Sequence, residues 1–280
     1  MTPLGPSRGP ARTPLAMDLG TSRTQIFAPG PGLLIDEPTL LATDRSGQVF
    51  AAGREAWQAS VSAGARVSRP VRRGLPVTPL GGARYLAMLL TRYRLRVEGP
   101  VVLAIPAVAS AYEASVLAAV PASVTGARIV PVESLLAAAM GAGLPIDEPA
   151  GGLICDLGAG ILEVGAVGEG RLLARSSATV GSAEYLDDRP RLVLRAAGAL
   201  QRVLDRVPDV VARELLSRPL HVVGGGALLP DIDDDLADGL RMQVVLQDDP
   251  RQAVIKGLSR CLSEALVRDA APVGSSGPPA

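Results

Sequence analysis

Two stretches of the chain decide its fold: AMDLGTSRTQIFAPGPGLL at residues 16–34 and ICDLGAGILEVGAVGEGRLL at residues 154–173. Each begins with an apolar strand that ends in Asp-Leu-Gly, turns tightly into a second strand, and reaches a third strand after another glycine-containing turn. Asp18 and Asp156 are the matched aspartates. Because one copy opens each half of the chain, the repeat predicts a molecule with two related lobes.

Both Asp-Leu-Gly turns have the composition of a polyphosphate-binding site. Glycine lets the backbone approach a ligand closely and adopt positive φ, and successive N–H groups of such a turn can hold phosphate oxygens. An aspartate at the strand end can orient Mg²⁺ through water, because Mg²⁺ seldom sheds its hydration shell. One such turn alone is more often an ordinary β-turn, but two copies facing each other would clamp a polyphosphate. We therefore expect a water-mediated Mg²⁺ site at Asp18 and Asp156.

A third glycine-rich element, HVVGGGALLPDIDDDL, lies at residues 221–236. Its three glycines follow a strand and precede a helix, which would bring a nucleotide's α-phosphate or sugar close to the backbone near a helix N-terminus. The alternative is a tight strand-to-helix connection without a ligand. The acidic residues that open the helix complement its dipole, and we prefer that interpretation to a metal site.

The rest of the chain alternates short strands with helices, which is typical of an α/β layered fold. Residues 66–82 are rich in arginine, proline and glycine and are expected to form a loop, and residues 83–95 have the apolar spacing of a helix. Residues 190–216 read as one long amphipathic helix interrupted near Pro208. The Pro/Gly-rich ends, 1–12 and 269–280, are expected to be disordered tails.

The composition excludes several classes of function. The 280 residues carry 28 basic and 28 acidic side chains, so no net field favours nucleic acid or an anionic membrane. Cys155 and Cys261 lack metal-site spacing and read as small buried hydrophobes. The single histidine, His221, precedes an apolar strand and is expected to be structural. The basic loop around Arg69 is expected to be solvated rather than a lipid or partner site.

The N-terminal segment lacks a long apolar region, and no stretch has the length of a membrane span, so the sequence predicts a cytoplasmic protein.

Together these motifs resemble the actin and seventy-kilodalton chaperone superfamily, and within it the MreB family, including the Mbl type. DLGTSRTQIF at 18–27 resembles the first phosphate hairpin of MreB-like chains, DLGTANTLIY. VESLLAAAMGAGLPIDEPAGGLICDLGAG at 132–160 resembles their connecting helix and second hairpin, and residues 222–262 resemble the adenosine segment with the second connecting helix. LIDEPTLLA at 34–42 and VFAAGREAWQ at 49–58 resemble the small first subdomain. The resemblance covers about residues 14–268.

This resemblance implies an actin-like (ribonuclease H-like) two-lobed α/β fold with a nucleotide cleft. It implies a first lobe at 13–146 with a small subdomain at about 36–69, a second lobe at 147–250, and a C-terminal helix at 251–268 that returns to the first lobe. Its nucleotide-binding residues would be Asp18, Gly20, Thr21, Ser22, Arg23, Asp156, Gly158, Ala159, Gly160, Gly224, Gly225, Gly226 and Ala227.

The chain departs from the family pattern at its catalytic groups. Ser134 stands where the family has its catalytic glutamate, and a serine cannot serve as the carboxylate that activates water. Ile161 and Leu162 replace two threonines, so hydroxyl ligands near the phosphates are lost, and Ala159 replaces a glycine. Arg23 replaces an asparagine and could either pair with phosphate or fill the site.

The largest departure is a deletion. Residues 179–198 pass almost directly into the long helix, where the family has a whole outer subdomain that holds the nucleotide sugar. The second lobe is therefore expected to lack that subdomain and one wall of its cleft.

The resemblance implies a cytoskeletal, cell-shape protein of MreB type, and the departures imply a degenerate ATPase site that binds ATP and Mg²⁺ weakly. Its expected partners are itself or a full-length MreB-like protein and cell-wall morphogenesis proteins, with peripheral association at the inner face of the cell membrane and no nucleic acid. Two alternatives stay open: a protein-binding scaffold with an empty cleft, and a small-molecule kinase or ATPase.

Overall fold

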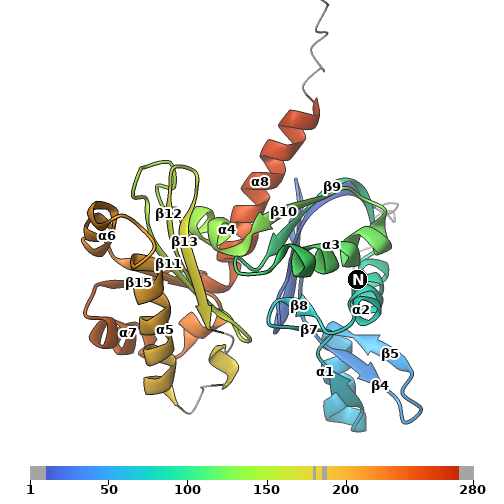
Figure 1. Ribbon diagram of the computed structural model, residues 1–280. Coiled ribbons are helices and arrows are strands. Elements are labelled where there is room, and N and C mark those ends of the chain that lie inside the picture. The colour runs from blue at the N-terminus through green and yellow to red at the C-terminus, as the bar shows by residue number, and fades with distance from the viewer. Residues whose placement is uncertain (1–10, 179–180, 185–187, 271–280) are drawn as a thin grey trace, which may run out of the picture.

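The computed structural model describes residues 11–178, 181–184 and 188–270, which build two five-stranded sheets and two smaller ones (Figure 1). The strands are β1 (Ala11–Leu19), β2 (Arg23–Ala28), β3 (Gly32–Pro38), β4 (Leu41–Thr43), β5 (Val49–Ala52), β6 (Arg66–Ser68), β7 (Val71–Arg72), β8 (Leu75–Pro76), β9 (Leu95–Ile105), β10 (Ile129–Glu133), β11 (Gly152–Leu157), β12 (Leu162–Gly168), β13 (Arg171–Ala178), β14 (Leu220–Val223) and β15 (Val244–Leu246). The helices are α1 (Gly53–Ala63), α2 (Pro79–Arg92), α3 (Ala111–Thr125), α4 (Ser134–Gly141), α5 (Arg189–Leu204), α6 (Asp209–Leu216), α7 (Ile232–Leu240) and α8 (Ala253–Ala270), with 3-10 turns η1 (Ser182–Glu184), η2 (Gly225–Leu228) and η3 (Pro250–Gln252).

The two large sheets have the same topology. The first has the order β10-β9-β1-β2-β3 and the second β13-β12-β11-β14-β15. In each, three antiparallel strands form a meander whose first strand then pairs in parallel with a later strand. The internal repeat predicted from the two Asp-Leu-Gly hairpins is therefore confirmed at the level of strand order.

Helices α4 and α8 lie between the two sheets (Figure 1) and join them through one apolar core. That core includes Ala16 and Val102 from the first sheet together with Ile154 and Val167 from the second. Each sheet packs a further core on its outer side, against α2 and α3 in the first lobe and against α5 and α7 in the second. Strand β12 is buried along its whole length because α4 and α5 cover its two faces.

The stretch predicted to be a loop, residues 66–82, is more ordered than its composition indicates. It contains β6, which pairs with β4, then the small hairpin β7–β8, and finally the first turn of α2. Pro79 occupies the first turn of that helix, where its missing N–H breaks no hydrogen bond. Thr78 caps the helix through its hydroxyl, which accepts from the N–H of Gly81 at 3.1 Å.

The two predicted tails are shorter than expected. Strand β1 begins at Ala11, which is in register with Leu95 of β9, so residues 11 and 12 belong to the sheet rather than to a tail. At the other end α8 continues to Ala270. Residues 1–10 and 271–280, the remainder of both predicted tails, lie outside the described residues.

The interruption predicted near Pro208 is confirmed, because α5 ends at Leu204 and α6 begins at Asp209. The expected lobe boundaries at 146/147 and 250/251 stay predictions. Within the described part of the chain, no helix combines the length and the apolar character needed to cross a membrane.

Candidate functional site

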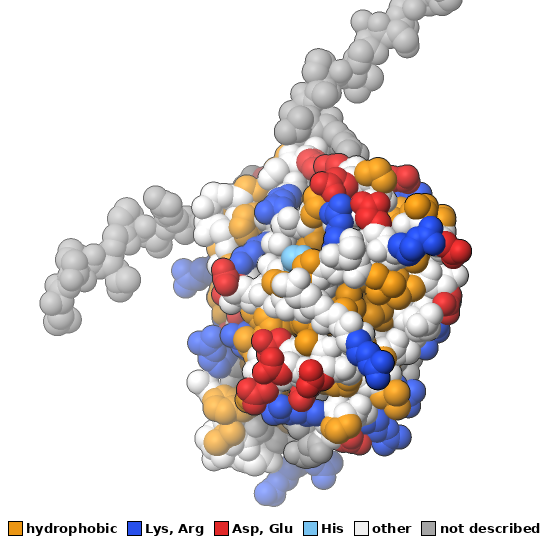
Figure 2. All heavy atoms as spheres, turned by 90° about the vertical axis from the view of Figure 1, so that its left-hand side faces the viewer, with side chains coloured by type: hydrophobic (Ala, Val, Ile, Leu, Met, Phe, Trp, Pro, Cys, Tyr) orange, Lys and Arg blue, Asp and Glu red, His pale blue; other side chains and the backbone are white. Residues whose placement is uncertain are grey.

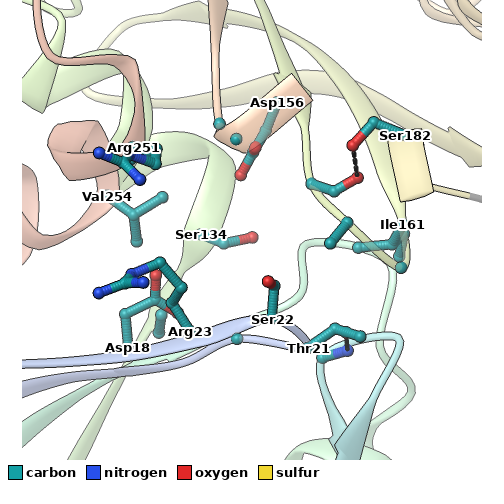
Figure 3. Close-up of a pocket in the computed structure, with 18 of the residues that line it drawn as sticks. Asp18, Thr21, Ser22, Arg23, Ser134, Asp156, Ile161, Ser182, Arg251 and Val254 are labelled. Carbon is teal, nitrogen blue, oxygen red and sulfur yellow. Dashed lines mark hydrogen bonds between the residues drawn. The ribbon is translucent and has the colours of Figure 1, made fainter. Parts of the chain in front are cut away.

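A cavity of about 420 Å³ lies where the two lobes meet, and the three glycine-rich turns surround it (Figure 3). One turn follows β1, the second joins β11 to β12, and the third follows β14. In the close-up, Asp18 from the first lobe and Asp156 from the second lie on opposite sides of the cavity, with Ser134 between them in this view. The predicted residues that line the cavity are Asp18, Gly20, Thr21, Ser22, Arg23, Ser134, Asp156, Gly158, Ala159, Gly160, Gly224 and Gly225.

Two predicted residues do not line this cavity. Gly226 and Ala227 lie in η2, which turns the chain back toward the second lobe. Ala227 is 3% exposed and belongs to that lobe's core, and a Cβ at Gly226 would lie 2.8 Å from Leu157 Cβ. The 3-10 turn directs both residues toward the second-lobe core, whereas Gly225 before them and Leu228 after them line the cavity.

The turns approach one another too closely for side chains larger than glycine at two positions. A Cβ at Gly160, in the second-lobe turn, would lie 2.7 Å from Thr21 Oγ1 in the first-lobe turn. A Cβ at Gly224, where φ is +85°, would lie 2.2 Å from Asp156 Oδ1. These glycines are therefore required by the contact between the three turns, not only by local turn geometry.

Three carboxylates are held in or beside the cavity with raised pKa values. Burial, together with the charge of Asp156, raises the pKa of Asp18 to about 7, and burial raises the pKa of Asp156 to about 6. Burial and then the charge of Asp156 raise the pKa of Glu163 to about 7, although the Ser134 hydroxyl and the nearby backbone N–H groups of Ala107 and Val108 act in the opposite direction. Burial disfavours the ionised forms of these carboxylates, so a cation bound between them would stabilise their negative charge.

Sequence reasoning missed Glu163 and Gln25. Asp156 pairs in register with Glu163 across β11 and β12, and Asp18 pairs with Gln25 across β1 and β2, so the two are equivalent positions of the repeat. Both side chains line the cavity and are almost fully buried, and an oxygen of each, Glu163 Oε1 and Gln25 Oε1, has no hydrogen-bond partner among the described residues. The equal spacing from each aspartate was the available signal.

Arg23 lines the cavity, but its guanidinium is held by a first-lobe carboxylate. Its Nε donates to Asp36 Oδ1 at 2.6 Å, and a terminal nitrogen donates to the Asp36 carbonyl at 2.8 Å. Arg251 of η3 also lines the cavity and was not predicted. Arg69, expected to be solvated, donates to the Thr21 carbonyl at 3.0 Å and so supports the first turn from outside.

The described residues contain no group of three or more His, Cys, Asp or Glu side chains arranged to bind a metal directly. The unpartnered oxygens of Gln25 and Glu163 and the facing aspartates fit a hydrated Mg²⁺ instead, because such an ion is held through its water molecules. Asp18 and Asp156 are the residues that would hold it.

The single histidine and Cys155 are not part of the cavity lining. The His221 Nδ1 lies 3.0 Å from Gln247 Nε2, and Cys155 is buried in the second-lobe core. These surroundings fit the structural roles expected of His221 and Cys155, but Cys261 of α8, also expected to be buried, is only partly buried.

The family model described as MreB/Mbl protein matches residues 12–195 and 190–268. The chain belongs to the MreB/Mbl family. Curated members of the family that it resembles include the cell shape-determining protein MreB of Escherichia coli K12, 23% identical over 91% of this chain and 94% of that protein. Another is the cell shape-determining protein Mbl of Bacillus subtilis 168, 22% identical over 87% of this chain and 93% of that protein.

Solved structures place this MreB/Mbl chain in the actin-like fold. MreB5 of Spiroplasma citri bound to ADP superposes with a TM-score of 0.80 at 19% identity, covering 92% of this chain and 98% of that chain. A MamK double helical filament superposes with a TM-score of 0.69 at 16% identity, covering 90% of this chain and 99% of that one. The actin-like fold that the resemblance implies is thus confirmed.

Proposed function

We propose that this chain is a cytoskeletal, cell-shape protein of MreB type whose cleft binds a nucleoside triphosphate with Mg²⁺ and hydrolyses it poorly. The observation that carries the proposal is the meeting of three backbone turns and two facing aspartates, Asp18 and Asp156, around one cavity between the lobes. MreB5 of Spiroplasma citri, which shares the fold, is known bound to ADP and to AMPPNP.

Impaired hydrolysis is supported by the side chains that replace the family's polar groups. Ser134 occupies the position of the expected catalytic carboxylate at the start of α4, and Ile161 brings an apolar side chain to the cavity where the family has a hydroxyl. Fewer polar partners for the triphosphate and for the attacking water imply weaker binding and slower turnover.

A missing outer subdomain in the second lobe is supported by two features. The family model matches in two pieces that meet at residues 190–195, close to where the deletion is expected. The alignment with the Escherichia coli protein spans 328 residues although this chain has 280, so that relative has residues without a counterpart here. One 3-10 turn, η1, is described between β13 and α5.

We propose further that the chain assembles with copies of itself or with a complete MreB-like protein, at the cytoplasmic face of the membrane and in support of cell-wall synthesis. Figure 2 shows the outer face of the second lobe, where apolar, acidic and basic side chains are interspersed. Helices α5 and α6 expose Leu194, Val210 and Leu216. Exposed apolar groups of this kind suit a protein contact.

Calorimetric titration with ATP–Mg²⁺, paired with a phosphate-release assay, tests the proposed nucleotide function. Gly225 offers a sharp variant, because it lines the cavity and a Cβ placed there would meet no atom within 4 Å. We expect Gly225→Leu to fold normally and to weaken ATP binding at least tenfold, while the matched control Gly198→Ala in α5 binds like the native chain. Native protein without measurable affinity for ATP, ADP or GTP would instead favour the scaffold with an empty cleft.

A further inference from the structure

Ser134 and Glu163 form a buried pair at the point where α4 meets β12. Ser134 is the first residue of α4 and is 9% exposed, and Glu163 is 2% exposed. The Ser134 hydroxyl donates to Glu163 Oε2 at 2.9 Å. The residue that replaces the family's glutamate therefore holds another glutamate by a direct hydrogen bond.

The second oxygen of Glu163 is left without a partner. Its Oε1 is buried and accepts no hydrogen bond of normal geometry from the described residues, although the backbone N–H groups of Ala107 and Val108 lie near enough to the carboxylate to lower its pKa. Ser134 and Glu163 both line the cavity between the lobes. Leaving a buried carboxylate oxygen unpaired costs folding free energy. Such an oxygen is maintained where a water molecule or a ligand group completes its hydrogen bonding.

We propose that Glu163 is the catalytic carboxylate of this cleft: it orients and deprotonates the water that attacks the γ-phosphate, with Ser134 as its positioning residue. This inference rests on the proposed nucleotide function. Glu163 of β12 thus takes the place of the carboxylate that is absent at position 134. The Ser134 hydroxyl fixes Glu163 Oε2, which leaves Oε1 to accept from the water.

In this step the water oxygen forms a bond to the γ-phosphorus while the bond from that phosphorus to the β,γ-bridging oxygen breaks. The bridging oxygen keeps the electron pair and leaves with the nucleoside diphosphate. The proton of the water passes to Glu163 Oε1 and then to inorganic phosphate or solvent, so that nucleoside triphosphate and water give nucleoside diphosphate, phosphate and a proton. No other reactant is needed. Because phosphoryl transfer depends mainly on positioning and charge, one well-oriented carboxylate has a large effect.

A purely structural role for the pair makes a different prediction. If Glu163 served only to hold the N-terminus of α4, its replacement would change stability and nucleotide affinity together, and any loss of turnover would follow from weaker binding. If Glu163 acts on the water, affinity is retained and the chemical step alone is slowed.

The test is single-turnover hydrolysis of ATP–Mg²⁺ by the full chain, with the affinity for AMPPNP–Mg²⁺ measured separately. For Glu163→Gln, which keeps an acceptor for the serine, we expect hydrolysis at least 100-fold slower and AMPPNP affinity within threefold of native. The matched control is Glu169→Gln, just beyond the same strand, where the exposed carboxylate pairs with Arg171 at 2.7 Å. The control should hydrolyse ATP at the native rate.

Substitutions that remove or keep the Ser134 hydroxyl test its role as the hydrogen-bond donor to Glu163. Ser134→Ala should slow hydrolysis threefold to tenfold at unchanged affinity, and Ser134→Thr, which keeps the donor, should retain the native rate. A Glu163→Gln protein that hydrolyses ATP as fast as native would overturn the proposal, and so would native protein that binds AMPPNP but shows no hydrolysis. In both cases the proposed nucleotide binding would stand, whereas absence of AMPPNP binding would remove both.

Discussion

At the scale of single residues, burial makes ionisation of the cleft carboxylates unfavourable. Asp18, Asp156 and Glu163 each have a pKa raised by burial, and for Asp18 and Glu163 the charge of Asp156 adds to the shift. A folded state that raises the pKa of an acid binds a proton more tightly than the unfolded chain does. Ionising these groups therefore weakens the fold, and a bound cation would relieve that penalty.

Because the pKa of Glu163 differs between the folded and unfolded chain, the unfolding free energy should depend on pH. The pKa of Glu163 rises from 4.5 to about 7, so its contribution is fully present below pH 4.5 and is lost as the pH rises through 7. The unfolding free energy of Glu163→Gln, minus that of the native chain, should grow by on the order of 2 kcal/mol between pH 4 and pH 8 in the absence of nucleotide. Urea denaturation at a series of pH values measures the difference.

The same series on Glu169→Gln provides the baseline, because that carboxylate is exposed and paired with Arg171. Its difference from the native chain should stay nearly constant with pH. A flat profile for Glu163→Gln as well would mean that Glu163 is solvated in the folded state, contrary to its burial.

The sequence predicted much of the cavity lining because glycine-rich turns have a local signature. Asp18 and Asp156 stand out from the repeated Asp-Leu-Gly, and both line the cavity. Glu163 was missed because its place depends on strand register: the pairing of β11 with β12 sets it opposite Asp156, and only the packing of α4 brings Ser134 to it. The pairing of Arg23 with Asp36 likewise depends on a partner from another strand.

At the scale of elements, the crossing of α4 and α8 decides how closely the lobes are joined. A Cβ at Gly257 of α8 would lie 1.8 Å from the Ala137 carbonyl oxygen of α4, and a Cβ at Gly141 would lie 1.8 Å from the Ala253 carbonyl oxygen. Each helix therefore uses a glycine to admit the backbone of the other. These two helices share the core that contacts both sheets.

We expect Gly257→Ala to lower the unfolding free energy by several kcal/mol, because the backbones must separate and the shared core must loosen. Gly198→Ala in α5 is the control, since its added Cβ would meet the end of the Arg202 side chain, at 3.4 Å. Alanine there should be neutral or stabilising by up to about 1 kcal/mol through helix propensity. Equal effects of the two substitutions in thermal and urea denaturation would contradict the close crossing.

Elements with a regular apolar period were predicted well, and those fixed by distant partners were not. The break between α5 and α6 follows from Pro208, which is local. The strands within residues 66–82 were missed because β6 is held by pairing with β4. The contact that stabilises β6 therefore lies far away in the sequence.

At the scale of the whole molecule, the cleft and the shared core make the two lobes one unit. The three turns come from both sheets, and Thr21 of the first lobe lies against Gly160 of the second. A triphosphate bound there would be held by both lobes at once. Ligand binding should consequently stabilise the whole chain rather than one lobe.

Binding of a triphosphate in this cleft should depend on Mg²⁺, because the three carboxylates and the triphosphate repel one another unless a cation lies between them. With Mg²⁺ and ATP at 100 times its dissociation constant, the folded state should gain about 2.7 kcal/mol, seen as a rise in the thermal midpoint of a single transition. Chelating Mg²⁺ with EDTA should abolish most of that rise, and Asp18→Asn should reduce the difference between the two conditions because it removes one of the charges that the cation balances. An ATP-dependent rise that is equally large in EDTA would show that the carboxylates of the cleft do not hold a cation.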